Sequence, residues 1–450
     1  MANTTLQFPG SFTWGTATAA FQIEGGHDAD GKGPSIWDTY SADSSRIADG
    51  KNAKVSCDHY HRYREDIALM AQLGYRNYRF SLSWPRIFPQ GRGNVNPAGL
   101  DFYDMLVDEL LANDITPFVT LFHWDLPQAL QEKGGWANRR TADAFADYGE
   151  TVAQRLGDRV KNWMTHNEPW VHAFAGHLFG HHAPGISDLP RALQTAHHIL
   201  LSHGLAVPRI RSACPGARIG LVHNLEWIEA ASDKDADVQA AKRHDGAFNR
   251  WYLDTVFYGR YPEDMCAWYK DAMPEIQEGD MQIIAAPCDF LGVNYYTRRI
   301  MAHETDSGFL HTRQVRWPFV PRAQYEEWEN NPEGLYRLLL RLKRDYNNPP
   351  IYISENGTPL EQDKVIDGIC SDPDRIEYIR RHAAAVWQAI QDGSDIRGYF
   401  VWSFLDNFEW NFGYSKRFGL IHVDFDSQKR TVKESGHWFS RVCKDNGFSL

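Results

Sequence analysis

In the segment VKNWMTHNEP (Val160–Pro169), a strand-like apolar run ends in a glutamate that a proline follows. The segment IYISENG (Ile351–Gly357) repeats this pattern, with Glu355 placed before Asn356-Gly357. A glutamate at the end of a strand, beside a turn-forming residue, is directed into a cleft rather than into a core. For either segment alone, the alternative is a helix start, where negative charge complements the helix dipole.

Strand-like segments alternate with amphipathic helical ones along the whole chain. Several strands are continuously apolar, as parallel strands covered on both faces are. No Gly/Ser-rich or Pro-rich linker divides the chain. The pattern predicts an α/β fold, a single (β/α)8 TIM barrel over residues 1–450 with long βα loops shaping an active-site cleft. A doubly wound sheet is the alternative, but the GxGxxG turn after the first strand is missing. The predicted strands are Phe12–Thr16, Tyr75–Ser81, Ile115–Leu121, Val160–His166, Ala217–His223, Phe290–Tyr295, Ile351–Ser354 and Gly398–Ser403.

In a barrel, the polar side chains that follow the strands converge on one cleft. Two carboxylates in such a cleft are the minimal equipment for cleaving a glycosidic bond, one as proton donor and the other as nucleophile or base. The 16 tryptophans suit a cleft that stacks on sugar rings, although core filling is the alternative. The residues predicted to converge are Gln22, Glu24, Arg79, His123, Trp124, Asn167, Glu168, Asn294, Tyr296, Glu355, Trp402, Glu409 and Trp410.

Composition excludes several classes of function. The net charge of −11 argues against nucleic acid and anionic membranes as partners, and no apolar run is long enough to span a bilayer. Six scattered cysteines without a CxxC pair, and an N-terminus without a signal-peptide pattern, predict a cytoplasmic protein with reduced thiols. The 19 histidines lack the HExxH spacing of a hydrolytic zinc site, so neither metal nor cofactor is expected. His59 and Asp66 are expected on a solvated helix surface.

Six segments resemble, in order, the sequence blocks of glycoside hydrolase family 1, the β-glucosidase family, and the match runs nearly from end to end. The chain departs from the family after Gly357, where Thr358-Pro359 replaces the usual small or apolar residues. The six segments are FTWGTATAAFQIEG (Phe12–Gly25), YRFSLSWPR (Tyr78–Arg86), FHWDLP (Phe122–Pro127), NEPW (Asn167–Trp170), GVNYYT (Gly292–Thr297) and WSFLDNFEW (Trp402–Trp410).

The resemblance implies a role for each matching residue. Glu168 is the implied acid/base and Glu355 the nucleophile, which Arg79, Asn294 and Tyr296 would surround. Glu168 would need a raised pKa, from partial desolvation and from the charge of Glu355. The implied sugar-binding residues are Gln22, His123, Trp124, Asn167, Glu409 and Trp410, with Trp402 as the stacking floor. Trp170 and Trp328 are implied on the aglycone side, and a loop over residues 298–331 is expected to form the aglycone wall.

The implied activity is that of a retaining β-glycosidase. Its substrates would be terminal non-reducing β-D-glucosyl, galactosyl or fucosyl residues of small β-glucosides and oligosaccharides such as cellobiose. Relatives that act on 6-phosphorylated sugars carry a serine and a lysine where this chain has Glu409-Trp410, which implies an unphosphorylated sugar. Two alternatives stay open: a transglycosylating β-glucosidase, and an inactive sugar-binding protein on the same fold. The sequence also leaves a homo-oligomer open.

Overall fold

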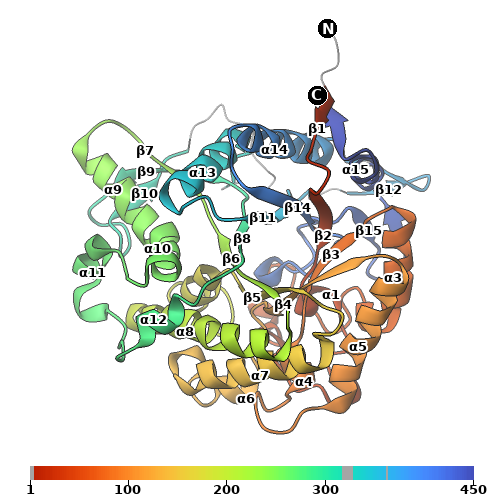
Figure 1. The fold of residues 1–450 in the computed structure, drawn as a ribbon, viewed down its shortest axis with the longest axis horizontal. Helices are drawn as coiled ribbons and strands as arrows, with labels where there is room; N and C mark the ends of the chain where they lie inside the picture. The colour runs from red at the N-terminus through yellow and green to blue at the C-terminus, as the bar shows by residue number, and fades with distance from the viewer. Residues whose placement is uncertain (1–4, 317–327, 361–362) are drawn as a thin grey trace.

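The computed structural model describes residues 5–316, 328–360 and 363–450 (Figure 1). Eight parallel strands close into a barrel in the order β11-β14-β2-β3-β4-β5-β6-β8. The TIM barrel prediction is therefore confirmed, and each predicted strand end lies within two residues of the observed one. The barrel strands are β2 (Thr13–Ala17), β3 (Asn77–Ser81), β4 (Thr116–Phe122), β5 (Asn162–Asn167), β6 (Arg218–Asn224), β8 (Phe290–Asn294), β11 (Ile351–Asn356) and β14 (Ile396–Trp402).

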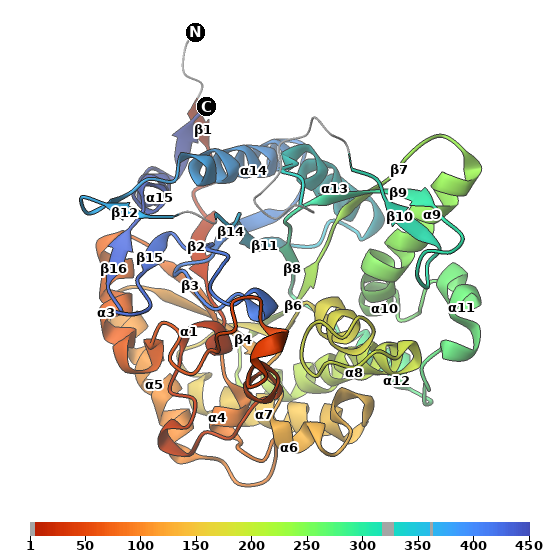
Figure 2. The ribbon, with the colours of Figure 1, turned by 180° about the vertical axis from the view of Figure 1, so that it is seen from behind.

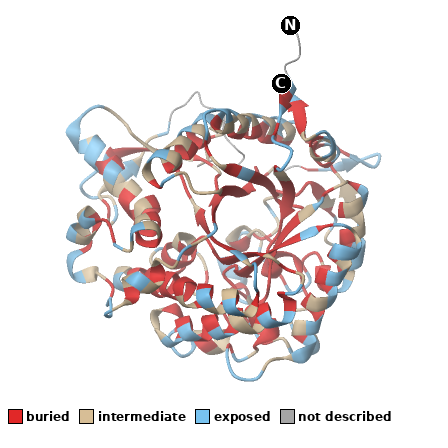
Figure 3. Cartoon of the chain, viewed as in Figure 1, coloured by how far each residue is buried: buried red, intermediate tan, exposed pale blue. Residues whose placement is uncertain are grey.

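Helices surround the barrel and bury one face against it, as the burial pattern in Figure 3 shows. In α13, the predicted apolar stripe of Leu335, Leu338, Leu339 and Leu342 is buried. The longer helices are α3 (His59–Gln72), α5 (Pro97–Ala112), α7 (Arg140–Leu156), α8 (Leu189–Ala213), α9 (Asp235–Asp245), α10 (Trp251–Tyr258), α13 (Pro332–Asp345), α14 (Pro373–Gln391) and α15 (Glu434–Asp445). The short ones are α1 (Ala20–Ile23), α2 (Ile36–Ser41), α4 (Trp84–Ile87), α6 (Gln128–Gln131), α11 (Glu263–Tyr269) and α12 (Asp280–Ile284).

Aromatic rings fill the barrel interior. The ring centroids of Phe118 and Phe400 lie 4.9 Å apart, and those of Phe290 and Tyr352 lie 5.2 Å apart. Glycines make room for these rings: a Cβ on Gly15 would lie 2.5 Å from the Phe400 ring, and a Cβ on Gly220 would lie 2.3 Å from Phe290. The barrel is consequently a packed core, which leaves its C-terminal end for a site.

Smaller sheets decorate the barrel. The predicted loop over residues 298–331 is corrected in part: β9 (Arg298–His303) and β10 (Thr312–Gln314) form a hairpin, and β9 also pairs with β7 (Trp227–Ala230). Residues 317–327 of that segment lie outside the described residues. β1 (Thr5–Gln7) pairs with β17 (Gly447–Ser449), so the first and last described strands lie side by side (Figure 1). The other small sheets are the pairs β12 (Val365–Ile366) with β13 (Ile369–Cys370) and β15 (Ile421–Val423) with β16 (Arg430–Val432).

Buried charge near the start of α3 corrects another prediction. His59 and Asp66 are buried rather than solvated, and Arg430 donates to Asp66 at 2.9 Å. All six cysteines are free thiols. Among the described residues, no helix combines the length and the apolar content that crossing a membrane requires.

Candidate active site

A cavity of about 350 Å³ opens at the C-terminal end of the barrel strands. In Figure 2, the loops that precede α3 and follow β14 lie in front of the barrel strands on this side. Most of the predicted site residues line the cavity. Three others, Gln22, Arg79 and Asn167, each form a hydrogen bond with a lining residue. The predicted residues in the lining are His123, Trp124, Glu168, Trp170, Asn294, Tyr296, Trp328, Glu355, Trp402, Glu409 and Trp410.

Glu355, near the end of β11, is held by two hydrogen-bond donors. Arg79 Nη1 lies 2.5 Å from Glu355 Oε1, and the Tyr296 hydroxyl donates to Oε2 at 2.7 Å. Both Glu355 and Arg79 are buried. A guanidinium and a phenol that donate to the same carboxylate stabilise its ionised form.

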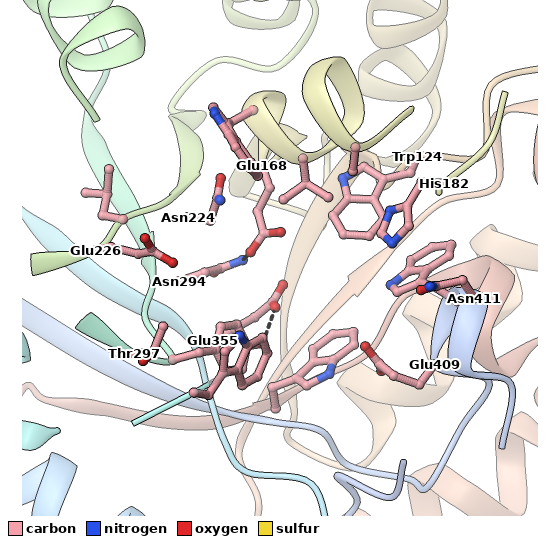
Figure 4. Close-up of a pocket in the computed structure, with 18 of the residues that line it drawn as sticks. Trp124, Glu168, His182, Asn224, Glu226, Asn294, Thr297, Glu355, Glu409 and Asn411 are labelled. Atoms are coloured by element: carbon pink, nitrogen blue, oxygen red, sulfur yellow. Dashed lines mark hydrogen bonds between the residues drawn. The ribbon is translucent and has the colours of Figure 1, made fainter. Parts of the chain in front are cut away.

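Glu168 follows the last residue of β5, and its surroundings favour the opposite protonation state. Burial, and after it the negative charge of Glu355, raise the pKa of Glu168 well above the usual value. The Asn294 amide donates to Glu168 Oε1 at 2.7 Å, although the resemblance places Asn294 beside Glu355. The two carboxyl groups point into the same space in Figure 4. The hydrogen bonds to Glu355 therefore favour a charged carboxylate there, whereas the surroundings of Glu168 favour its protonated form.

Asn167 connects the residues around the two glutamates. Its Oδ1 accepts from Arg79 Nη2 at 2.7 Å and from Asn294 Nδ2 at 3.1 Å, and its Nδ2 donates to His123 Nε2 at 3.0 Å. Burial, with a smaller effect of Arg79, lowers the pKa of His123 well below its usual value. His123 is consequently neutral, accepts at Nε2 and carries its proton on Nδ1.

Glu409 and two tryptophans form the wall next to β14. Gln22 Nε2 donates to Glu409 Oε2 at 3.3 Å and to the Phe408 carbonyl at 2.9 Å. Burial raises the pKa of Glu409 to about 8, and the charge of Glu355 adds to this shift. The Trp410 and Trp124 rings pack at 4.6 Å, and Figure 4 shows the Glu409 carboxyl turned toward the centre of the pocket.

Three pocket residues have left-handed backbone conformations that are rare outside glycine. The φ angles are 77° at Trp124, 49° at Glu168 and 51° at Trp410. Such conformations cost free energy, and they cluster at functional sites, where the direction of a side chain is needed for function. Each one turns a side chain at the end of a barrel strand, or on the loop after it, toward the cavity.

The opposite wall is aromatic and is built on two π-helical turns, η4 (Val171–Ala175) and η5 (Gly246–Arg250). The Trp170 ring packs against Phe248 at 4.4 Å, and Trp328 stacks on Tyr296 at 4.7 Å. π-Helical turns are rare and occur often at functional sites. The two tryptophans implied on the aglycone side thus line this wall.

The cavity also contains residues that the sequence analysis missed. Asn224 ends β6 and Thr297 follows β8, so the rule that polar residues follow barrel strands would have found both. Glu226 lies between β6 and β7 and pairs with Arg299 at 2.9 Å. Conversely, Glu24 was predicted to face the cleft, but its carboxylate accepts from Arg86 at 2.9 Å and from Tyr103 at 2.6 Å. The other missed lining residues include Phe248 and Asn411.

Comparisons with known proteins agree with this architecture. Residues 4–448 match the model of glycosyl hydrolase family 1. Beta-glucosidase A of Acetivibrio thermocellus is 47% identical over 98% of this chain and 99% of its own length, and beta-glucosidase A of Thermotoga maritima is 46% identical over 98% of each. A solved structure of the Thermotoga maritima family 1 glycoside hydrolase with a cyclophellitol analogue transition state mimic has a TM-score of 0.96, with 46% identity over 99% of both chains. The chain belongs to glycosyl hydrolase family 1.

Proposed function

We propose that this chain is a retaining β-glucosidase that hydrolyses terminal non-reducing β-D-glucosyl residues of small β-glucosides and oligosaccharides such as cellobiose. The observation that carries the proposal is the contrast between two buried glutamates in one pocket. Arg79 and Tyr296 stabilise charge on Glu355, whereas burial and Glu355 itself keep a proton on Glu168. Double displacement at a sugar carbon requires one ionised carboxylate as nucleophile and one protonated carboxyl group as acid.

In the first step, a Glu355 oxygen forms a bond to the anomeric carbon while the bond to the leaving-group oxygen breaks. Glu168 transfers its proton to that oxygen, so the aglycone leaves as a neutral alcohol. Once Glu355 is esterified, its charge no longer raises the pKa of Glu168. Glu168 is then a carboxylate and takes a proton from the water that attacks the anomeric carbon, while the bond between that carbon and the Glu355 oxygen breaks. This step regenerates the Glu355 carboxylate and releases the sugar with its original β configuration.

Buried polar atoms near the β14 wall fit the hydroxyl groups of a bound sugar. Gln22 Oε1 and His123 Nδ1 have no hydrogen-bond partner among the described residues. A buried acceptor and a buried donor of this kind are stabilised when a ligand hydroxyl supplies the missing partner. Glu409, Trp410 and Asn167 complete the proposed glycosyl subsite, over Trp402 as its floor.

An unphosphorylated sugar suits this subsite. With a pKa of about 8, Glu409 is protonated at neutral pH before substrate binds. Its repulsion of a phosphate group is therefore weaker than that of an ionised carboxylate. The described lining residues include no lysine, and their one arginine, Arg299, is already paired with Glu226. A phosphate group would therefore lose its hydration without gaining a free cation.

We place the activity in the cytoplasm, where the six free cysteines would stay reduced.

Proton NMR during hydrolysis of an aryl β-glucoside tests the proposal, because it identifies the anomer that forms first. We expect β-glucose first, with the α-anomer growing in later by mutarotation. First release of α-glucose would contradict retention, and binding without turnover would identify a sugar-binding protein instead. A parallel panel of galactosides, fucosides and cellobiose ranks the accepted sugars and leaving groups.

A further inference from the structure

A network of buried charges lies outside the cavity, between the loops that follow β11 and β14 and the start of α15. At its centre is Lys433, whose side chain is fully buried. Its ammonium donates to a carboxylate oxygen of Asp363 and, at 2.8 Å, to Asp406 Oδ1. A lysine buried to this extent requires anionic partners, because an unpaired charge there would be strongly destabilising.

Two arginines balance the remaining charge. Arg375 donates to Asp363 through Nη2 and to Asp372 through Nε, at 2.8 Å in both cases. Arg417 Nη1 donates to Asp406 Oδ2 at 2.8 Å. The network thus contains three cations and three carboxylates. They are Lys433, Arg375, Arg417, Asp363, Asp372 and Asp406.

The same charges hold the backbone of both loops. Arg375 donates to the carbonyl oxygen of Thr358, three residues beyond Glu355, and also to the Arg417 carbonyl at 3.1 Å. The Gly419 N–H donates to Asp406 Oδ1 at 3.0 Å. Asp406 itself lies three residues before Glu409. One network therefore fixes the chain just after one proposed catalytic glutamate and just before the proposed sugar-binding one.

A short chain of hydrogen bonds leads to the cavity from Asn407, the sequence neighbour of Asp406. Asn407 donates from Nδ2 to Ser403 Oγ at 3.0 Å and to the Leu405 carbonyl at 3.1 Å. These two bonds orient Asn407 Oδ1 so that it accepts from Gln22 Nε2 at 3.1 Å. The same Gln22 nitrogen also lies 3.3 Å from Glu409 Oε2. A shift of Asp406 would accordingly move both Gln22 and Glu409.

We propose that Lys433 is a positioning residue for the glycosyl subsite. Through Asp406 it holds Gln22 and Glu409 in place, and through Asp363 and Arg375 it joins their loop to the loop that carries Glu355. The inference rests on the proposed function, since it concerns how the same site binds the sugar. It assigns to Lys433 a role in transition-state binding, which differs from a role in stability alone.

A double-mutant cycle between Lys433 and Glu409 tests the inference. The Lys433 change is made as the pair K433M and D363N, which leaves two cations and two carboxylates in the network. The readout is kcat/KM for 2,4-dinitrophenyl β-glucoside, divided by the concentration of active sites from mechanism-based trapping. In the wild-type background we expect a loss of about a hundredfold, the scale of a 1 Å misplacement. In the Glu409→Ala background we expect a much smaller further loss, of about threefold at most, because Glu409 is gone and only the smaller effect through Gln22 remains.

One control variant and one replacement variant make the result decisive. Lys161→Met removes a lysine at the opposite end of the barrel, where its Nζ donates to the Gly157 carbonyl at 2.6 Å, and should reduce kcat/KM equally and slightly in both backgrounds. If the paired variant does not fold, Lys433→Arg serves in its place, and its smaller loss should again vanish in the Glu409→Ala background. Equal losses in both backgrounds would overturn the inference. Absence of turnover in the wild type would instead overturn the proposed function.

Discussion

At the scale of single residues, one side-chain type has opposite properties in one pocket because its neighbours differ. Glu355 receives hydrogen bonds from Arg79 and Tyr296, whereas Glu168 receives one from the neutral amide of Asn294. The Arg79 guanidinium donates to Glu355 and so favours a charged carboxylate there. Burial, and after it the charge of Glu355, raise the pKa of Glu168 and favour its protonated form.

Glu168→Gln should separate substrates by leaving group. Because dinitrophenolate leaves without a proton, we expect the variant to form the glycosyl-enzyme from dinitrophenyl glucoside at nearly the wild-type rate. Alkyl glucosides and cellobiose need the proton, so their kcat/KM should fall by about 10²–10⁴-fold. Deglycosylation should slow for every substrate, which stopped-flow measurement would record as a burst of dinitrophenol.

The pH profile gives an independent check on the same residue. The alkaline limb of kcat/KM reports the free enzyme's acid, so it should lie well above the usual glutamate pKa in the wild type and vanish in Glu168→Gln. Equal losses for good and poor leaving groups, with the alkaline limb intact, would show that Glu168 is not the acid/base.

Residue contacts were only partly predictable from the sequence. The resemblance to family 1 implied that Arg79 and Tyr296 support Glu355, and both donate hydrogen bonds to it in the structure. The partner of Asn294 was not predictable, since its amide lies within reach of two glutamates and only the three-dimensional geometry selects Glu168. Glu24 was misplaced for a similar reason: the helical turn of α1 directs it toward Arg86 instead of the cleft.

At the scale of elements, close approach between strand ends explains the glycine after Glu355-Asn356. A Cβ on Gly357 would lie 1.9 Å from the carbonyl oxygen of Trp402, the last residue of β14. No side chain fits at that distance without backbone movement. The glycine thus allows the two strands that carry Glu355 and Trp402 to end side by side.

Gly357→Ala should consequently displace one of these strand ends. We expect a loss of about 1–3 kcal/mol in the free energy of unfolding, the usual range for overpacking, together with reduced kcat/KM. Denaturant unfolding and kinetics on an aryl β-glucoside measure the two effects. Gly10→Ala is the matched control, because a Cβ there has no neighbour within 4 Å. Unchanged stability and activity in Gly357→Ala would contradict the close approach.

Element prediction succeeded where strands are long and apolar and failed where pairing alone defines them. The eight barrel strands have buried runs that local pattern reveals. In contrast, β9 has partly exposed ends and β10 has only three residues, none of them buried. β9 pairs with both β10 and β7, and this pairing defines the two strands. A local sequence pattern contains no information about such pairing.

At the scale of the whole molecule, contacts between distant parts of the chain hold charges that looked solvated in the sequence. Asp66 on α3 pairs with His59 at 2.8 Å and with Arg430, which is 364 residues away. Burial raises the pKa of Asp66, but the hydrogen bonds and charges of His59 and Arg430 outweigh it and leave the pKa below the usual value. The helical spacing of residues 58–66 holds no information about Arg430, so the burial could not be predicted.

Asp66→Asn should destabilise the fold at neutral pH by about 3–5 kcal/mol, because Arg430 would lose its buried partner. A carboxyl whose pKa is lowered on folding stabilises the native state above its unfolded pKa of about 3.9, and loses that effect as pH falls through the folded value. The Tm difference between wild type and variant should therefore be large at pH 7 and shrink below about pH 4. A difference that stays constant between pH 7 and pH 3 would contradict the ion-pair account.

The most direct test of the central claim is covalent trapping with 2-deoxy-2-fluoroglucosyl fluoride, followed by peptide mapping. The fluorine at C2 slows both steps, and the good leaving group lets the first proceed, so the glycosyl-enzyme accumulates. We predict a stoichiometric mass increase of one fluoroglucosyl group, located on Glu355, with loss of activity that recovers as the adduct turns over. An adduct on another residue, or an enzyme that hydrolyses β-glucosides and is never labelled, would contradict the assignment of Glu355 as the nucleophile of a retaining β-glucosidase.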